Sequence, residues 1–208
     1  LAAATKLLER RLDATADDHA ASVIDDALNQ ARAALDTLRG CVPQASAESL
    51  GQVDLNEVLH DLLKIATARL LTAGVVVDWS PDPALPGVPG YNGQIFTLFK
   101  QLIDNAIDAV DERRAGERLL RIRTQAGPDH VEVTLEDTGP GIPAEWRYKV
   151  FEPFFTTKGA DHRHLGMGLS MVQEAVSRHG GLIDFDTEYR NGCRVRVQLP
   201  IVGGGDHE

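Results

Sequence analysis

The sequence predicts an α+β protein in which a mixed sheet carries helices on one face, preceded by a helical hairpin. Three features of the chain lead to this fold class. Residues 19–38 place apolar side chains at helical spacing. Residues 118–125 and 130–137 alternate apolar and polar side chains around a short turn. A glycine-rich stretch, residues 136–170, follows them and leads into a last helix and hairpin. Each of these elements must bury one apolar face, which favours two packed layers.

The composition argues against several classes of function. The 208 residues carry a formal net charge of −10, which is unfavourable for a surface that binds nucleic acid or anionic lipid. The longest apolar runs are too short to span a bilayer. Cys41 and Cys193 are isolated thiols, as expected in a reducing cytoplasm. We therefore expect a cytoplasmic domain with no direct nucleic-acid partner and no membrane span. Because the chain begins at Leu1 rather than Met, we also expect it to be a piece of a longer protein.

The first 40 residues are predicted to form a helical hairpin. A helix ends near Leu12, polar residues 13–18 break it, and a second helix follows. The apolar positions of the second helix are spaced 4, 3, 4, 3, as in a bundle: Ile24, Leu28, Ala31, Leu35 and Leu38. A lone hairpin cannot bury two apolar stripes, so we expect a homodimeric four-helix bundle. The alternative is a helix packed on its own domain.

Residues 41–52 are a linker by composition, residues 53–202 a second domain, and residues 203–208 a disordered tail. Asp54 and Glu57 predict a capping box at the start of a helix that Gly74 ends. Its inward side chains are expected to be Leu55, Val58, Leu62, Ile65 and Leu70.

The remaining elements of the second domain follow from periodicity and turn residues. Residues 75–79 predict a strand, and residues 80–90, with four prolines, a loop. Asn92 is expected to cap a helix that runs to about Glu112. Further predictions are a hairpin over 118–137, a short helix from Pro143, a helix over 168–179, and a final hairpin over 182–185 and 193–199 with Asn191 and Gly192 in its turn.

The glycine-rich stretch predicts a nucleotide pocket of a type other than the P-loop. The carboxylate of Asp137 is followed by four glycines, Gly139, Gly141, Gly166 and Gly168. Glycine at this density is expected where a ligand approaches the main chain closely.

Four motifs make this interpretation specific. The order of NAIDA (105–109), DTGPGIP (137–143), FEPFFTTK (151–158) and GMGLS (166–170) resembles the N, G1, F and G2 boxes of sensor histidine kinases. That family shares the Bergerat-type sandwich, also called the GHKL fold, with gyrase, a class of heat-shock chaperones and MutL. The match covers about residues 53–200, and the hairpin before it resembles the second half of a kinase dimerisation domain.

The resemblance implies that ATP or ADP binds here with Mg²⁺. Asn105 offers an amide oxygen to the metal, and Asp137 accepts from the exocyclic amino group of adenine. Gly139 and Gly141 admit the base, and Ala109, Ile142 and Leu169 form apolar walls. Gly166 and Gly168 precede a helix whose free N–H groups attract phosphates, within reach of Lys158. Asp108, Thr157 and Met167 complete the expected nucleotide-binding set.

Three departures from the kinase pattern limit the predicted chemistry. Gln101 stands four residues before Asn105, where gyrase-like ATPases have a glutamate base, so no catalytic residue is assigned. His164 replaces the first glycine of the G2 box. No phosphoacceptor pattern of His, acid and Pro is present around His19, so any acceptor precedes Leu1. His162 and His164 suggest a metal site only weakly, because no further ligand lies nearby in the sequence.

A narrower resemblance concerns function. The segments LLERRL (7–12), VVVDWSP (75–81) and TEYRNGCRVRVQLP (187–200) resemble the C-terminal transmitter region of the nitrogen-fixation regulator NifL. This implies that adenine nucleotide acts as a signal that controls a NifA-like transcriptional activator. Two alternatives stay open: an active histidine kinase that phosphorylates a histidine upstream, and a GHKL ATPase or protein serine kinase.

Overall fold

The computed structural model describes residues 49–113, 116–156, 166–186 and 188–201. The predicted hairpin of residues 1–40 and the predicted tail of residues 203–208 lie outside this part of the chain. In the described part, no helix combines the length and apolar character needed to cross a membrane.

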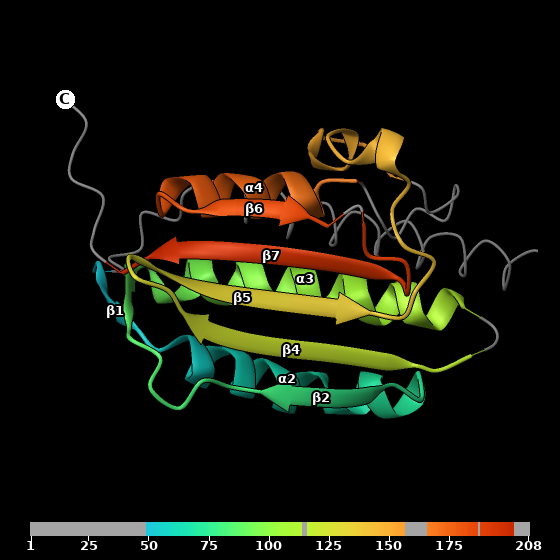
Figure 1. The fold of residues 1–208 in the computed structure, drawn as a ribbon, viewed down its shortest axis with the longest axis horizontal. Helices are drawn as coiled ribbons and strands as arrows, with labels where there is room; N and C mark the ends of the chain where they lie inside the picture. The colour runs from blue at the N-terminus through green and yellow to red at the C-terminus, as the bar shows by residue number, and fades with distance from the viewer. Residues whose placement is uncertain (1–48, 114–115, 157–165, 187, 202–208) are drawn as a thin grey trace, which may run out of the picture. The chain divides into compact units, whose positions relative to one another are not determined.

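A five-stranded mixed sheet forms the centre of the domain (Figure 1). Its order is β2 (Val76–Ser80), β4 (Leu119–Ala126), β5 (His130–Asp137), β7 (Cys193–Pro200) and β6 (Leu182–Phe185). Strand β2 runs parallel to β4, and the other neighbours are antiparallel. The two predicted hairpins are therefore confirmed, and the sheet is mixed as expected.

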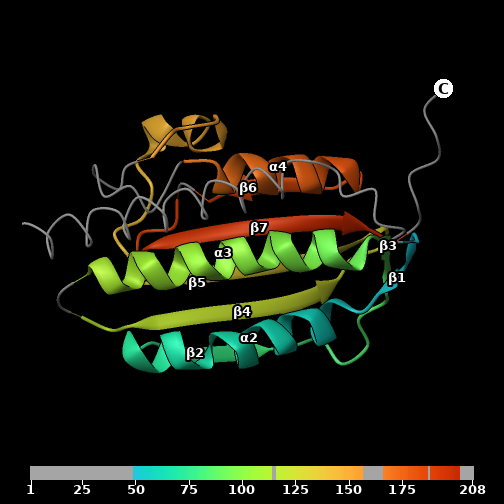
Figure 2. The same ribbon diagram turned by 180° about the vertical axis from the view of Figure 1, so that it is seen from behind.

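Three helices cover one face of the sheet, which Figure 2 shows from the helical side. They are α2 (Leu55–Thr72), α3 (Asn92–Glu112) and α4 (Gly168–Arg178), and two short 3₁₀ turns, η1 (Ala144–Trp146) and η2 (Lys149–Phe151), lie between β5 and α4 in the sequence. The core lies between the layers, where Phe99 of α3 and Leu120 and Ile122 of β4 are fully buried. The helices occupy this face because the strands alternate and turn their apolar side chains toward it.

Helix α2 begins after Asp54 and is followed by Gly74, as predicted, but of the predicted capping box the described hydrogen bonds include only those to the Asp54 carboxylate. The Asp54 carboxylate accepts hydrogen bonds from the backbone N–H groups of Asn56 (2.9 Å) and Glu57 (3.1 Å). Gly74 follows the helix with a φ of 62°, in the left-handed region that favours glycine. The expectation for Ile65 was wrong, because its side chain is 64% exposed. Ala66 takes the core position between Leu62 and Leu70 in the helical repeat.

Two further predictions are corrected. Strands β1 (Gly51–Val53) and β3 (Val88–Gly90) pair antiparallel, although they were assigned to the linker and to the proline-rich loop. A strand of this kind tolerates Pro89 because it lies at an edge. The cap of α3 is Tyr91 and uses no side-chain hydrogen bond, whereas Asn92 is already the first helical residue. The backbone O of Tyr91 accepts the first helical bond from Ile95, so the helix starts one residue earlier than predicted.

The face of the sheet opposite the helices is charged. Glu136 of β5, only 5% exposed, lies between Arg121 of β4 (3.0 Å) and Arg194 of β7 (2.9 Å). Each arginine also pairs with a second carboxylate, Asp78 or Asp186. These ion pairs extend over four strands. They neutralise the buried carboxylate of Glu136, which would be costly to bury without a partner.

Candidate nucleotide-binding site

Asp137, the last residue of β5, points to the helical side of the sheet and is 7% exposed. Its Oδ1 accepts from the backbone N–H of Gly139 (2.8 Å) and, less closely, of Cys193 (3.4 Å). Burial raises the pKa of the Asp137 carboxyl to about 6, against the opposing effect of these two hydrogen bonds. The carboxylate is thus desolvated and has spare acceptor capacity, as suits a ligand with an N–H donor.

Glycines bring main chain close to this carboxylate. A Cβ on Gly139 would lie 2.8 Å from the Ala109 Cβ and 2.8 Å from Asp137 Oδ1, so only glycine lets this turn pack on α3. Gly141 has a φ of 77°, and its Cβ would lie 2.6 Å from the carbonyl oxygen of Gly192. The sequence led us to expect space for a base at these glycines. The structure gives them a further reason, close packing against α3 and against the loop before β7.

One stripe of α3 carries the other expected contacts. Gln101, Asn105 and Ala109 follow one another at intervals of four residues and share a helix face. Nε2 of Gln101 donates to Oδ1 of Asn105 at 3.0 Å. Asp108 forms a 2.7 Å ion pair with Arg69 of α2, an electrostatic partner that the sequence did not suggest. The stripe therefore joins the Asp137 end of the site to the start of α4.

The start of α4 forms the opposite end of the site. Gly166 has a φ of 66° and packs on the backbone of Phe154 and Phe155. Met167 precedes the helix, and its carbonyl oxygen accepts from the Ser170 hydroxyl at 2.8 Å. The first backbone N–H groups of such a helix have no partner within it and favour anions.

Ile142 and Leu169, the expected apolar walls, are both partly buried against the core. Thr157 and Lys158 lie outside the described residues, as do His162 and His164. The structure thus places Asn105, Ala109, Asp137, Gly139 and Gly168 on the helical side of the sheet. That these residues bind a nucleotide stays a prediction.

No sequence pattern indicated that the loop before β7 contacts Asp137. Gly192 has a φ of 138°, and a Cβ there would overlap the carbonyl oxygen of Asp137. Cys193 pairs with Asp137 in register and donates to its carboxylate. Burial raises the pKa of the Cys193 thiol, and the charge of Asp137 adds to this effect. The only sequence signal was the Asn191-Gly192 turn, which predicted a hairpin but no contact with Asp137.

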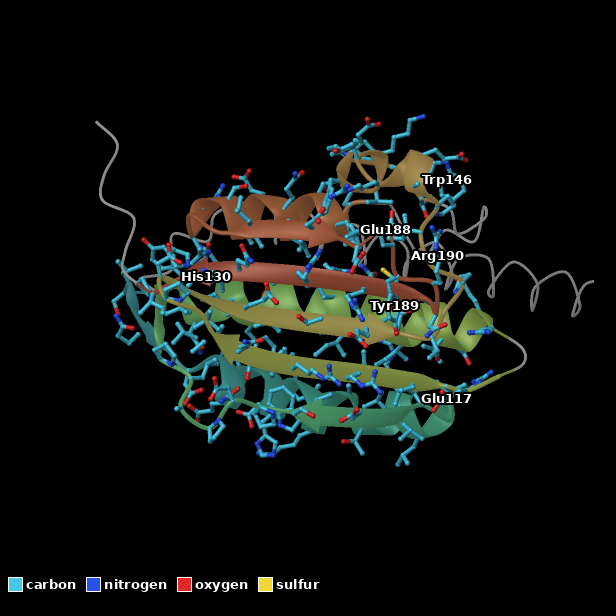
Figure 3. The ribbon with its side chains drawn as sticks, in the orientation of Figure 1. Glu117, His130, Trp146, Glu188, Tyr189 and Arg190 are labelled. Atoms are coloured by element: carbon cyan, nitrogen blue, oxygen red, sulfur yellow. The ribbon has the colours of Figure 1, made fainter. Side chains whose placement is uncertain are left out.

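A separate polar cavity of about 820 Å³ lies at the same end of the sheet. Figure 3 shows Glu117, Tyr189 and Arg190, three of its lining residues, on the charged face. Its lining includes Gly139 but neither Asp137 nor Asn105. The backbone of residues 138–140 therefore borders both this cavity and the Asp137 site.

A mixed sheet with helices on one face and glycine-rich turns around a buried carboxylate defines an α+β nucleotide-binding sandwich. The model of the "Histidine kinase-, DNA gyrase B-, and HSP90-like ATPase" family matches residues 90–203, more than half of the chain. The chain belongs to this family, and the described part is an ATP-binding transmitter domain of the sensor histidine kinase type.

Named relatives agree with this assignment. Sensory histidine kinase/phosphatase NtrB of Rhizobium leguminosarum bv. phaseoli is 30% identical over 160 residues, which are 71% of this chain and 40% of that protein. Full-length ShkA in complex with AMPPNP superposes with a TM-score of 0.65 at 23% identity, over 91% of this chain and 37% of that one. ThkA in complex with the response regulator TrrA gives 0.67 at 21% identity, over 84% and 49%. Both structural matches concern the fold alone.

Proposed function

We propose that this chain binds ADP or ATP at Asp137, together with Mg²⁺ at Asn105, and that nucleotide occupancy controls its interaction with a NifA-like transcriptional activator. Residues 1–40 would supply a homodimerising hairpin, residues 41–52 the linker, and residues 53–202 the nucleotide-binding domain. A cytoplasmic location follows from this proposal, since both the nucleotide and the activator are found there.

The proposal rests on the burial and the hydrogen bonds of the Asp137 carboxylate. A buried carboxylate whose hydrogen bonds come from two backbone N–H groups keeps the acceptor capacity that the exocyclic amino group of adenine needs. Guanine presents an oxygen where adenine has this amino group, and two facing acceptors would repel each other. A site built on Asp137 therefore favours adenine over guanine nucleotides.

The donor set also suits Mg²⁺. Asn105 offers one amide oxygen on the half-buried face of α3. Mg²⁺ prefers oxygen ligands and commonly takes most of them from phosphates and water, so a single protein oxygen beside a phosphate site fits it. When bound, the ion would neutralise charge on the phosphates.

Gln101 supports binding rather than steady hydrolysis. Its amide cannot accept a proton from an attacking water, and its Nε2 already donates to Asn105. A nucleotide-sensing role needs only that nucleotide bind two states of the protein with different affinity.

Histidine phosphotransfer is the second candidate function, because the relative named NtrB is a histidine kinase/phosphatase. Under this hypothesis the chain would serve a phosphoacceptor histidine upstream and would engage a response regulator. A longer protein incubated with γ-labelled ATP separates the two candidates. Acid-labile, alkali-stable phosphate on the protein would establish the kinase, and its absence alongside nucleotide binding would support the sensor.

Calorimetric titration of residues 1–208 with ADP, ATP and GTP tests the common premise. We expect binding of ADP and ATP, at least tenfold weaker binding of GTP, and a loss of adenine selectivity in Asp137→Ala. Binding that is equal for all three nucleotides, or unaffected by Asp137→Ala, would contradict the proposal.

A further inference from the structure

The side chain of Gln101 lies between the two halves of the expected site. On one side its Nε2 donates to Asn105 Oδ1 at 3.0 Å. On the other side it lies against the first residue of α4, since a Cβ on Gly168 would be 2.5 Å from Nε2 and 2.7 Å from Cδ. Gln101 therefore fills the space that Gly168 leaves and joins the metal-binding residue to the phosphate end.

We propose that Gln101 is a positioning residue that holds the Asn105 amide with its oxygen, rather than its nitrogen, toward the metal and phosphate end of the site. This inference rests on the proposed function, in which Asn105 binds Mg²⁺. It assigns a role to a residue that would otherwise be known only for lacking the chemistry of a base.

Amide geometry gives Gln101 this role. An asparagine amide can turn over and exchange its oxygen for its NH₂ group, which cannot bind a cation. Nε2 of Gln101 donates to Asn105 Oδ1 at 3.0 Å, and an NH₂ group of Asn105 in that place could not accept this bond. With Nε2 facing Asn105, Gln101 therefore favours one of the two orientations of the Asn105 amide. The amide oxygen has two lone pairs, and the second stays available to the metal. Partners of this kind beyond the metal ligands commonly change metal affinity about 10–100-fold when removed.

Gly168 leaves the space that the Gln101 amide occupies. A side chain at this position would displace the Gln101 amide and with it the hydrogen bond to Asn105. Glycine at the start of α4 thus has a packing reason that is independent of any contact between main chain and phosphate.

The test compares nucleotide affinity with Mg²⁺ and with EDTA, using residues 1–208. The variant Gln101→Met keeps an unbranched side chain of similar length and removes the donor. We expect the ratio of ADP dissociation constants, EDTA over Mg²⁺, to fall about tenfold or more. The affinity in EDTA should stay within about twofold, because the metal-free contacts are unchanged. Gln173→Leu, which alters an exposed glutamine of α4, is the matched control and should keep the wild-type ratio.

Three outcomes overturn the inference. An unchanged ratio in Gln101→Met would show that Asn105 needs no orienting partner. An equal loss of affinity with and without Mg²⁺ would show a contact of Gln101 with nucleotide or a general structural role. A wild-type protein that binds ADP in neither condition would refute the proposed function itself. Should Gln101→Met fail to fold, Gln101→Leu removes the same donor with a side chain suited to half-buried positions.

Discussion

Glu136 and Asp137 are neighbours in β5, both carboxylates and both nearly buried, yet they face opposite sides of the sheet. Glu136 lies between two arginines on the charged face. On the helical face, Asp137 accepts hydrogen bonds from two backbone N–H groups, and burial raises its pKa to about 6. The first carboxylate is neutralised by arginines, whereas the second has the acceptor capacity that the proposed function assigns to adenine. The charges around a buried acid thus distinguish an acid in a structural ion pair from a candidate binding residue.

The largest effect is expected at Glu136. The substitution Glu136→Ala leaves Arg121 and Arg194 partly buried without their shared partner and should lower the free energy of unfolding by about 3 kcal/mol. ADP affinity should change little, because Glu136 faces away from the site. Urea denaturation measures the first quantity and calorimetry the second. Asp78→Ala removes only the more exposed partner of Arg121 and should have a much smaller effect on unfolding.

The opposite pattern is expected at Asp137. Under the proposed function, the substitution Asp137→Asn removes a charge-assisted hydrogen bond to adenine that is worth about 1.5–3 kcal/mol, so ADP affinity should fall about 10–150-fold. The raised pKa means that ionised Asp137 destabilises the free protein at neutral pH. Stability should therefore rise, by up to about 3 kcal/mol. If the variant were less stable and equally able to bind ADP, the distinction between the two acids would not hold.

The pH dependence follows from the same pKa of about 6 for Asp137. This pKa lies above that of the unfolded chain, so the contribution of Asp137 to stability falls as pH rises between about 4 and 6 and is constant above. ADP affinity should run the other way, because the ionised acid is the better acceptor. We expect it to fall about tenfold between about pH 7 and pH 5, where roughly 10% of the carboxyl is ionised. In Asp137→Asn this component of the pH profile should disappear.

The smallest effect is expected at Asp54, which also accepts from two backbone N–H groups but is exposed to solvent. Asp54→Ala should lower the free energy of unfolding by about 1 kcal/mol, the usual value of a helix cap, without altering ADP affinity. A stabilising effect, as expected for Asp137→Asn, would show that burial is not what separates these two residues.

Much of the fold was predictable because it depends on local patterns. The alternation in β4 and β5, the repeat in α3 and the cap at Asp54 each follow from residues close together in sequence. The pair of β1 and β3 was not predictable in this way, since short strands with proline resemble a linker and a loop until their partner is known. Ile65 was misplaced because Ala66, a small residue, occupies the core position beside it.

The site was predictable as a set of motifs but not as a set of contacts. The motifs predicted Asn105, Asp137 and the glycines, and the structure places Asn105, Asp137, Gly139 and Gly168 on one side of the sheet. The sequence could not reveal that Cys193 donates to Asp137 across 56 positions, or that Gly168 makes room for Gln101. Such contacts depend on how strands and helices pack, which no local pattern records.

The most direct test of the central claim is the pKa of the Asp137 carboxyl, followed by NMR in the free protein and with saturating ADP. We predict a value near 6 in the free protein and a value at least about one unit lower with ADP, because a hydrogen bond to the ionised form favours that form. A free value near that of an ordinary aspartate, or a value that ADP leaves unchanged, would contradict the claim that Asp137 is held for adenine.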